Sequence, residues 1–125
     1  MRGLVAAAAL LLIAACGAAD PEPAPAGPPV SELRVGMQEY AFVLSAGTLA
    51  VGPVSVVVTN AGSAAHDVVL RQDGRELARS EVLSPGGRQV LDVRVEPGTP
   101  VHLECTLTGH SPAGMHATLR VAGGG

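Results

Sequence analysis

The sequence predicts an all-β domain, a Greek-key β-sandwich or barrel of about eight strands. Short Val-rich segments alternate with turn residues, and β-branched side chains favour strands over helices. No segment shows sustained helical periodicity. The length of 125 residues suits a single domain, and the aromatic content of 2% indicates a core of Val, Leu and Ala.

The expected strands are short segments that are apolar throughout or at alternate positions. Turn residues such as Asn, Asp-Gly and Pro-Gly separate them. We expect strands at 32–35, 38–44, 54–59, 67–70, 77–83, 89–95, 101–105 and 117–121. We expect turns at 52–53, 60–62, 73–74, 84–87 and 96–98.

The N-terminus carries the features of a secretion signal. Arg2 precedes an apolar run over 4–15, which is shorter than the roughly 20 residues needed to span a bilayer. The run ends in Ile-Ala-Ala-Cys16-Gly, which resembles the bacterial lipobox. We therefore predict a lipoprotein signal peptide at 1–15 and lipidation of Cys16. Ordinary signal cleavage nearby is the alternative.

A proline-rich segment follows the predicted lipidation site. Residues 17–30 include five prolines, which remove backbone donors and disfavour a packed element. We therefore divide the mature chain into a lipidated Cys and linker at 16–30 and a folded domain at 31–125. The expected location is extracytoplasmic, in the periplasm or on the outer cell surface, with a lipid anchor in the membrane.

The net charge argues against binding to nucleic acid. The whole chain has a formal charge of −3. Arg2 is the only charged residue before Cys16, so the mature chain keeps seven basic residues against eleven acidic ones. Nucleic-acid binders usually show a basic excess on one face.

Cys105 begins a segment with three metal-binding side chains. If Cys16 is lipidated, Cys105 has no disulfide partner in an oxidising compartment. His110 and Met115 follow it in the segment CTLTGHSPAGM, and His66 lies on a different predicted strand. Two imidazoles, a thiolate and a weak thioether are the ligands of type 1 copper, whereas Met is a poor ligand for zinc. We predict one copper site.

The order His66, Cys105, His110, Met115 and the ligand segment resemble those of the cupredoxins, such as azurin, pseudoazurin and plastocyanin. The resemblance extends over about 33–121 and is specific at the two ligand segments. It implies a one-electron carrier with a single type 1 (blue) copper on a Greek-key sandwich. Asp67 stands where azurin and plastocyanin commonly have Asn, and azurin's disulfide has no counterpart.

Other polar residues near the predicted ligands have open roles. The strand period of two places His102 and His116 on the outer surface. Asp67 and Thr106 adjoin ligands and could orient them, since ligands usually need fixed partners. Asn60 could cap the loop before His66 or be a plain turn residue.

Electron transfer is the expected function, and redox proteins are the expected partners: a cytochrome c, an oxidase or a reductase. We expect a monomer. The alternative is extracytoplasmic copper binding or delivery without electron transfer. We do not expect an enzyme, because multicopper oxidases and copper nitrite reductases need further His-rich copper motifs, and this sequence has no His-x-His pair.

Overall fold

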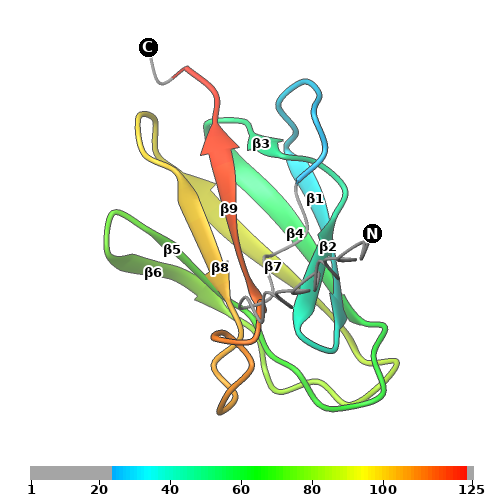
Figure 1. The fold of residues 1–125 in the computed structure, drawn as a ribbon. Helices are drawn as coiled ribbons and strands as arrows, with labels where there is room; N and C mark the ends of the chain where they lie inside the picture. Colours follow the sequence, from blue (N-terminus) through cyan, green and yellow to red (C-terminus); the bar gives the residue numbers. More distant parts are fainter. Residues whose placement is uncertain (1–23, 124–125) are drawn as a thin grey trace, which may run out of the picture.

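The computed structural model describes residues 24–123, which fold into two packed β-sheets without a helix in that range. Figure 1 shows the two layers. One sheet has the order β2-β1-β4-β7, and the other β3-β9-β8-β5-β6. The nine strands are β1 (Glu32–Gln38), β2 (Ala41–Leu44), β3 (Thr48–Leu49), β4 (Gly52–Asn60), β5 (Val69–Gln72), β6 (Arg75–Arg79), β7 (Arg88–Val95), β8 (Val101–Glu104) and β9 (His116–Val121).

The core lies between the sheets and follows the strand period of two. Alternate residues of β1, β4 and β7 point inward, and alternate residues of β8 and β9 meet them from the other sheet. Almost all of these side chains are aliphatic, as the composition predicts. They include Leu33, Val35, Val54, Val56, Val58, Leu91, Val93, Val101, Leu103 and Leu119.

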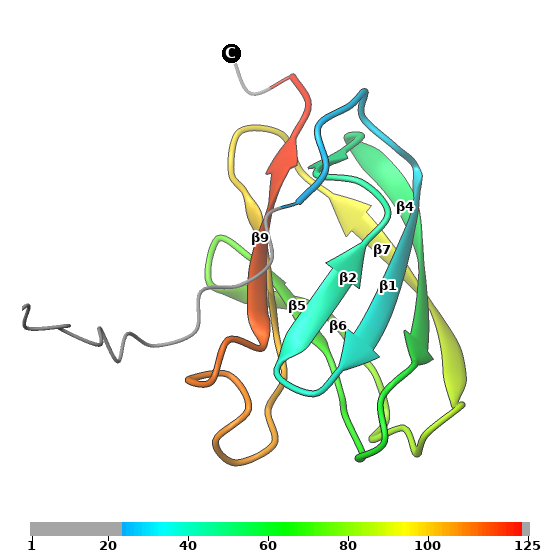
Figure 2. The same cartoon turned by 45° about the vertical axis from the view of Figure 1, so that its right-hand side comes forward.

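The connections between strands bring three segments to one end of the sandwich. Figure 2 shows the β1–β2 turn, the connection from β4 to β5 and the loop from β8 to β9 at the same end. β8 and β9 pair antiparallel, so the loop between them begins and ends on neighbouring strands. The β4–β5 connection and the β8–β9 loop carry all four predicted copper ligands.

The all-β fold is confirmed, and each of the eight expected strands overlaps an observed one. Several local predictions were wrong. The strand expected at 77–83 extends too far, because β6 ends at Arg79. The expected turn at 52–53 lies within β4, and the expected strand at 38–44 is divided by a turn at Glu39–Tyr40. The two-residue strand β3 was missed, because it pairs only with the end of β9 and has no alternation of its own. The strand at Glu32–Gln38 continues three residues beyond its expected end.

The last linker residues contact the domain. Val30 forms a parallel bridge with Leu49, and its N–H donates to the Thr48 carbonyl at 3.0 Å. The predicted signal peptide at 1–15 and Cys16 lie outside the described residues. Within residues 24–123, no helix is long and apolar enough to cross a membrane.

Replacing Val56 with Ala should lower the free energy of unfolding by about 2–3 kcal/mol, because it removes two buried methyl groups and leaves a cavity. Val56 is fully buried on β4, whereas Val90 on the neighbouring β7 is 45% exposed. The control Val90→Ala should change stability by less than about 0.5 kcal/mol. Urea unfolding measures both values, and equal losses would contradict the described core.

Candidate metal centre

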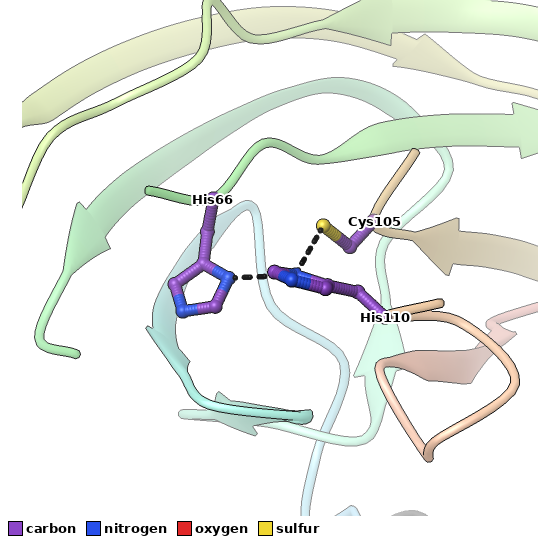
Figure 3. Close-up of side chains that lie close together, drawn as sticks. All are labelled: His66, Cys105 and His110. Atoms are coloured by element: carbon purple, nitrogen blue, oxygen red, sulfur yellow. Dashed lines mark hydrogen bonds between the residues drawn. The ribbon is translucent and has the colours of Figure 1, made fainter. Parts of the chain in front are cut away.

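Three of the four predicted ligands form one compact cluster. The nearest ligand atoms of His66, Cys105 and His110 all lie within 4.8 Å of one another. The two Nδ1 atoms are 3.2 Å apart, and Nδ1 of His110 is 3.5 Å from the Cys105 sulfur. Figure 3 shows the His110 ring between the other two side chains. This is the only such cluster of His, Cys, Asp and Glu side chains among residues 24–123.

The β8–β9 loop is held closed by backbone hydrogen bonds between the predicted ligands themselves. The Cys105 N–H donates to the Met115 carbonyl at 3.1 Å, and the Met115 N–H donates to the His110 carbonyl at 3.0 Å. Gly109 and Gly114, which precede two of the ligands, have φ angles of 82° and 118°, a region that favours glycine. The loop therefore returns Met115 beside Cys105.

His66 reaches the cluster from the β4–β5 connection. Its N–H and carbonyl both bond to Leu83, at 3.1 and 2.8 Å. The buried Asn60 side chain donates to the carbonyls of Ala64 and Leu83 and accepts from the Gly62 N–H. The sequence left the role of Asn60 open, and the structure shows that it caps this loop.

Asp67 joins the two ligand segments. Its side chain is buried, Oδ1 accepts the Thr106 N–H at 2.7 Å, and Oδ2 accepts the Thr106 hydroxyl. Because Asp67 follows His66 and Thr106 follows Cys105, this pair of bonds fixes one ligand segment against the other. Asp67 and Thr106, whose roles the sequence left open, therefore hold the two ligand segments together by bonding to each other.

Glu39 and Tyr40 contact the two histidines, and the sequence did not identify either residue. One Glu39 oxygen lies 3.3 Å from Nε2 of His66, and the Tyr40 ring meets the His110 ring edge-on with centroids 5.4 Å apart. Hydrogen bonds from the N–H groups of Ala64 and Ser63 lower the pKa of Glu39 to about 2. The only available signal was Glu39 itself, a charged residue that interrupts an apolar segment.

Burial and nearby charges act on the Cys105 thiol. Burial raises its pKa, since it disfavours the charged thiolate, and the carboxylate of Asp67 acts in the same direction. The backbone N–H groups of Asp67 and Leu107 oppose this effect and favour the thiolate. A bound metal cation would favour the thiolate further.

The donor set fits a single type 1 copper ion. His66, Cys105 and Met115 are buried, while His110 is partly exposed. The two imidazoles and the Cys105 sulfur lie close enough together to bind one metal ion, and Met115 lies beside Cys105. This donor set matches the ligand preferences of copper in both oxidation states. The other two histidines of the described chain, His102 and His116, are exposed as predicted, and His102 contacts Thr118.

Replacing Asp67 with Asn should retain copper and raise the reduction potential by on the order of tens of millivolts. Asn can accept the Thr106 N–H and donate to its hydroxyl, but it carries no negative charge to favour the oxidised ion. Asp92→Asn on the exposed face of β7 is the control. Voltammetry of copper-loaded protein measures both potentials, and an unchanged Asp67→Asn value would exclude this electrostatic effect.

Comparison with known proteins gives a clear result for the fold. No protein-family model matches the sequence, and no curated protein matches it. Among solved structures, auracyanin from Roseiflexus castenholzii has 17% identity and a TM-score of 0.67, covering 76% of this chain and 99% of that one. Auracyanin A, a "blue" copper protein from Chloroflexus aurantiacus, has 18% identity and a TM-score of 0.58, covering 75% and 99%.

A purple cupredoxin from Nitrosopumilus maritimus also matches, with 22% identity, a TM-score of 0.51 and coverage of 74% of this chain and 100% of that one. Multicopper oxidases match over 31% to 41% of their own length. These likenesses show the fold. The chain has the cupredoxin fold, and its His-Cys-His cluster beside Met115 fits a blue copper site.

Proposed function

We propose that this protein carries single electrons between redox partners by means of one type 1 copper ion held by His66, Cys105, His110 and Met115. The observation that supports the proposal best is the convergence of the imidazole Nδ1 atoms and a buried thiol within 4.8 Å. Copper would supply a one-electron couple between its two common oxidation states. A structural zinc site would not explain the Met residue.

The surroundings of the four side chains suit electron transfer because they limit movement. Backbone hydrogen bonds fix the loop from Cys105 to Met115, and Asp67 joins this loop to the His66 segment. A site that keeps its geometry when the charge of the metal changes exchanges electrons with little reorganisation. Rigid ligands therefore suit an electron carrier. They suit a copper-delivery protein less well, because such a protein must release its metal.

His110 is the predicted ligand through which electrons would enter and leave. It is partly exposed, whereas His66 is completely buried. The exposed Pro112 and half-buried Ala113 lie in the same loop. A partner such as a cytochrome c, an oxidase or a reductase would dock at this end of the sandwich, beside the His110 ring.

Copper delivery is the competing function, and an enzymatic role is not part of the proposal. Multicopper catalysis needs additional copper centres, whereas the described chain holds one candidate cluster. Fast, reversible oxidation and reduction by a cytochrome supports the carrier. Slow electron exchange combined with ready transfer of Cu(I) to an acceptor protein would instead support delivery.

Copper-loaded protein should show an intense blue absorption band that Cys105→Ser abolishes, because the band requires a copper–thiolate bond. Visible absorption spectroscopy of both proteins makes the measurement. Cys16→Ser is the matched control, since it removes the other cysteine of the chain and should leave the band intact. A colourless copper-loaded wild-type protein would refute the proposed function. A Cys105→Ser variant that remains blue would refute it as well.

We also propose that the mature protein is attached to a membrane, outside the cytoplasm, through lipid on Cys16. The lipobox-like sequence before Cys16 and the prolines after it support this arrangement. Two or more acyl chains give stable attachment, since each buried methylene contributes about 0.8 kcal/mol. Because Ala24 and Val30 pack against the domain core, only residues 17–23 of the linker could extend, up to roughly 20 Å at about 3.1 Å per residue, which would let the copper end approach membrane-bound partners.

Cells grown with labelled palmitate should incorporate label into the wild-type protein, because lipidation of Cys16 adds fatty acyl chains. Cys16→Ser should lose the label completely. Cys105→Ser, which changes the other cysteine in the same way, should keep it. Gel autoradiography after immunoprecipitation measures the incorporation, and label retained by Cys16→Ser would refute the anchor while leaving the copper site unaffected.

A further inference from the structure

The β1–β2 turn contacts both histidines of the metal centre through consecutive residues. Glu39 and Tyr40 connect β1 to β2 at the end of the sandwich that carries the ligand loops, as Figure 2 shows. Tyr40 has a φ of 60°, which bulky residues rarely adopt. Such a conformation persists only where surrounding contacts hold it, and these conformations cluster at functional sites. The contacts of the turn therefore indicate its role.

The Glu39 carboxylate fixes the orientation of His66. Its Oε1 accepts the N–H groups of Ser63 and Ala64 at 2.7 and 2.9 Å and lies 3.3 Å from Nε2 of His66. Because an ionised carboxylate can only accept, the proton of the neutral imidazole belongs on Nε2. Nδ1, which faces His110, then has a free lone pair for a metal.

Gly62 makes this approach of Glu39 possible. A Cβ atom at position 62 would lie 2.5 Å from Oε1 of Glu39 and 3.1 Å from Nε2 of His66. Any larger residue would therefore push the carboxylate away from the imidazole. The glycine, the glutamate and the histidine come from two separate segments that meet at this hydrogen bond.

Tyr40 makes the corresponding contact with the second histidine. Its ring packs against His110 at an interplanar angle of 79°, which is the favourable edge-to-face arrangement. Tyr40 is 51% exposed, so burial in the core does not explain its strained backbone. His110 is the less buried of the two histidines, and the contact restricts rotation of its ring.

We propose that the β1–β2 turn is a positioning element of the copper site, in which Glu39 sets the tautomer and electron donation of His66 and Tyr40 holds the ring of His110. The inference rests on the proposed function. When a negative group accepts a hydrogen bond from the imidazole nitrogen that does not bind the metal, the other nitrogen donates more electron density to the metal. Glu39 therefore favours oxidised over reduced copper and lowers the reduction potential.

Glu39→Gln in the whole chain tests the electronic role, because Gln keeps an acceptor oxygen and removes only the charge. We expect the affinity for Cu(II) relative to Cu(I) to fall at least tenfold, which is a rise of about 59 mV in reduction potential. The blue band should remain. Glu32→Gln is the matched control, since Glu32 begins the same strand that Glu39 follows and contacts Arg34 instead of the site. Its potential should not change.

Nitrogen NMR of the metal-free whole chain gives a second readout that does not depend on copper. His66 should be the Nε2–H tautomer in the wild type, and Glu39→Ala should produce a mixture of tautomers. Gly62→Ala, which displaces the carboxylate without altering charge, should change the spectrum in the same direction. An Nδ1–H tautomer of His66 in the wild type would overturn the positioning role of Glu39.

Tyr40→Asn tests the second contact, because Asn tolerates a positive φ but has no ring to place against His110. We expect copper affinity to fall about tenfold, and the conservative variant Tyr40→Phe to rescue it. Unchanged affinity in Tyr40→Asn would overturn the role of Tyr40. An unmoved potential in a blue Glu39→Gln protein would overturn only the role of Glu39, whereas a colourless wild type would overturn the proposed function itself.

Discussion

Closure of the loop between β8 and β9 is the constraint on which the metal centre depends. Cys105 and Met115 stand at its two ends and are joined by a backbone hydrogen bond of 3.1 Å, while a second bond links Met115 to His110. Because β8 and β9 are hydrogen-bonded neighbours, the sheet itself fixes the distance between the loop ends. The three candidate ligands of this loop are thus placed by backbone contacts before any metal binds.

The fourth candidate ligand has to be brought to this loop from another part of the chain. His66 is fixed by its two backbone bonds to Leu83, and the adjacent Asp67 bonds to Thr106, directly after Cys105. The cap formed by Asn60 holds the intervening residues. Buried polar side chains without hydrogen-bond partners would lower the stability of the fold. Among the described residues, every buried side-chain nitrogen and oxygen has a hydrogen-bond partner.

The sequence predicted the fold class and the overlap of eight strands, because both depend on local patterns of side chains. It predicted the clustering of His66, Cys105 and His110 from their residue types and from the resemblance to the cupredoxins. It could not predict the division of the segment 38–44. Tyr40 turns the chain in a conformation that its residue type disfavours, so no Gly, Pro or Asn marked the turn. Glu39 was missed for a different reason, because its contact with His66 joins residues 27 positions apart and no motif marks it as a partner of the site.

Two carboxylates therefore flank one candidate ligand. Glu39 contacts the far nitrogen of His66, and Asp67 follows His66 in the chain and bonds to the residue after Cys105. Each carboxylate is held by hydrogen-bond donors of its own, the N–H groups of Ser63 and Ala64 for Glu39 and Thr106 for Asp67. Both charges favour the metal state of higher positive charge. A copper ion held here would consequently have a lower potential than in the same fold with neutral groups at both positions, which would restrict its electron donors to stronger reductants.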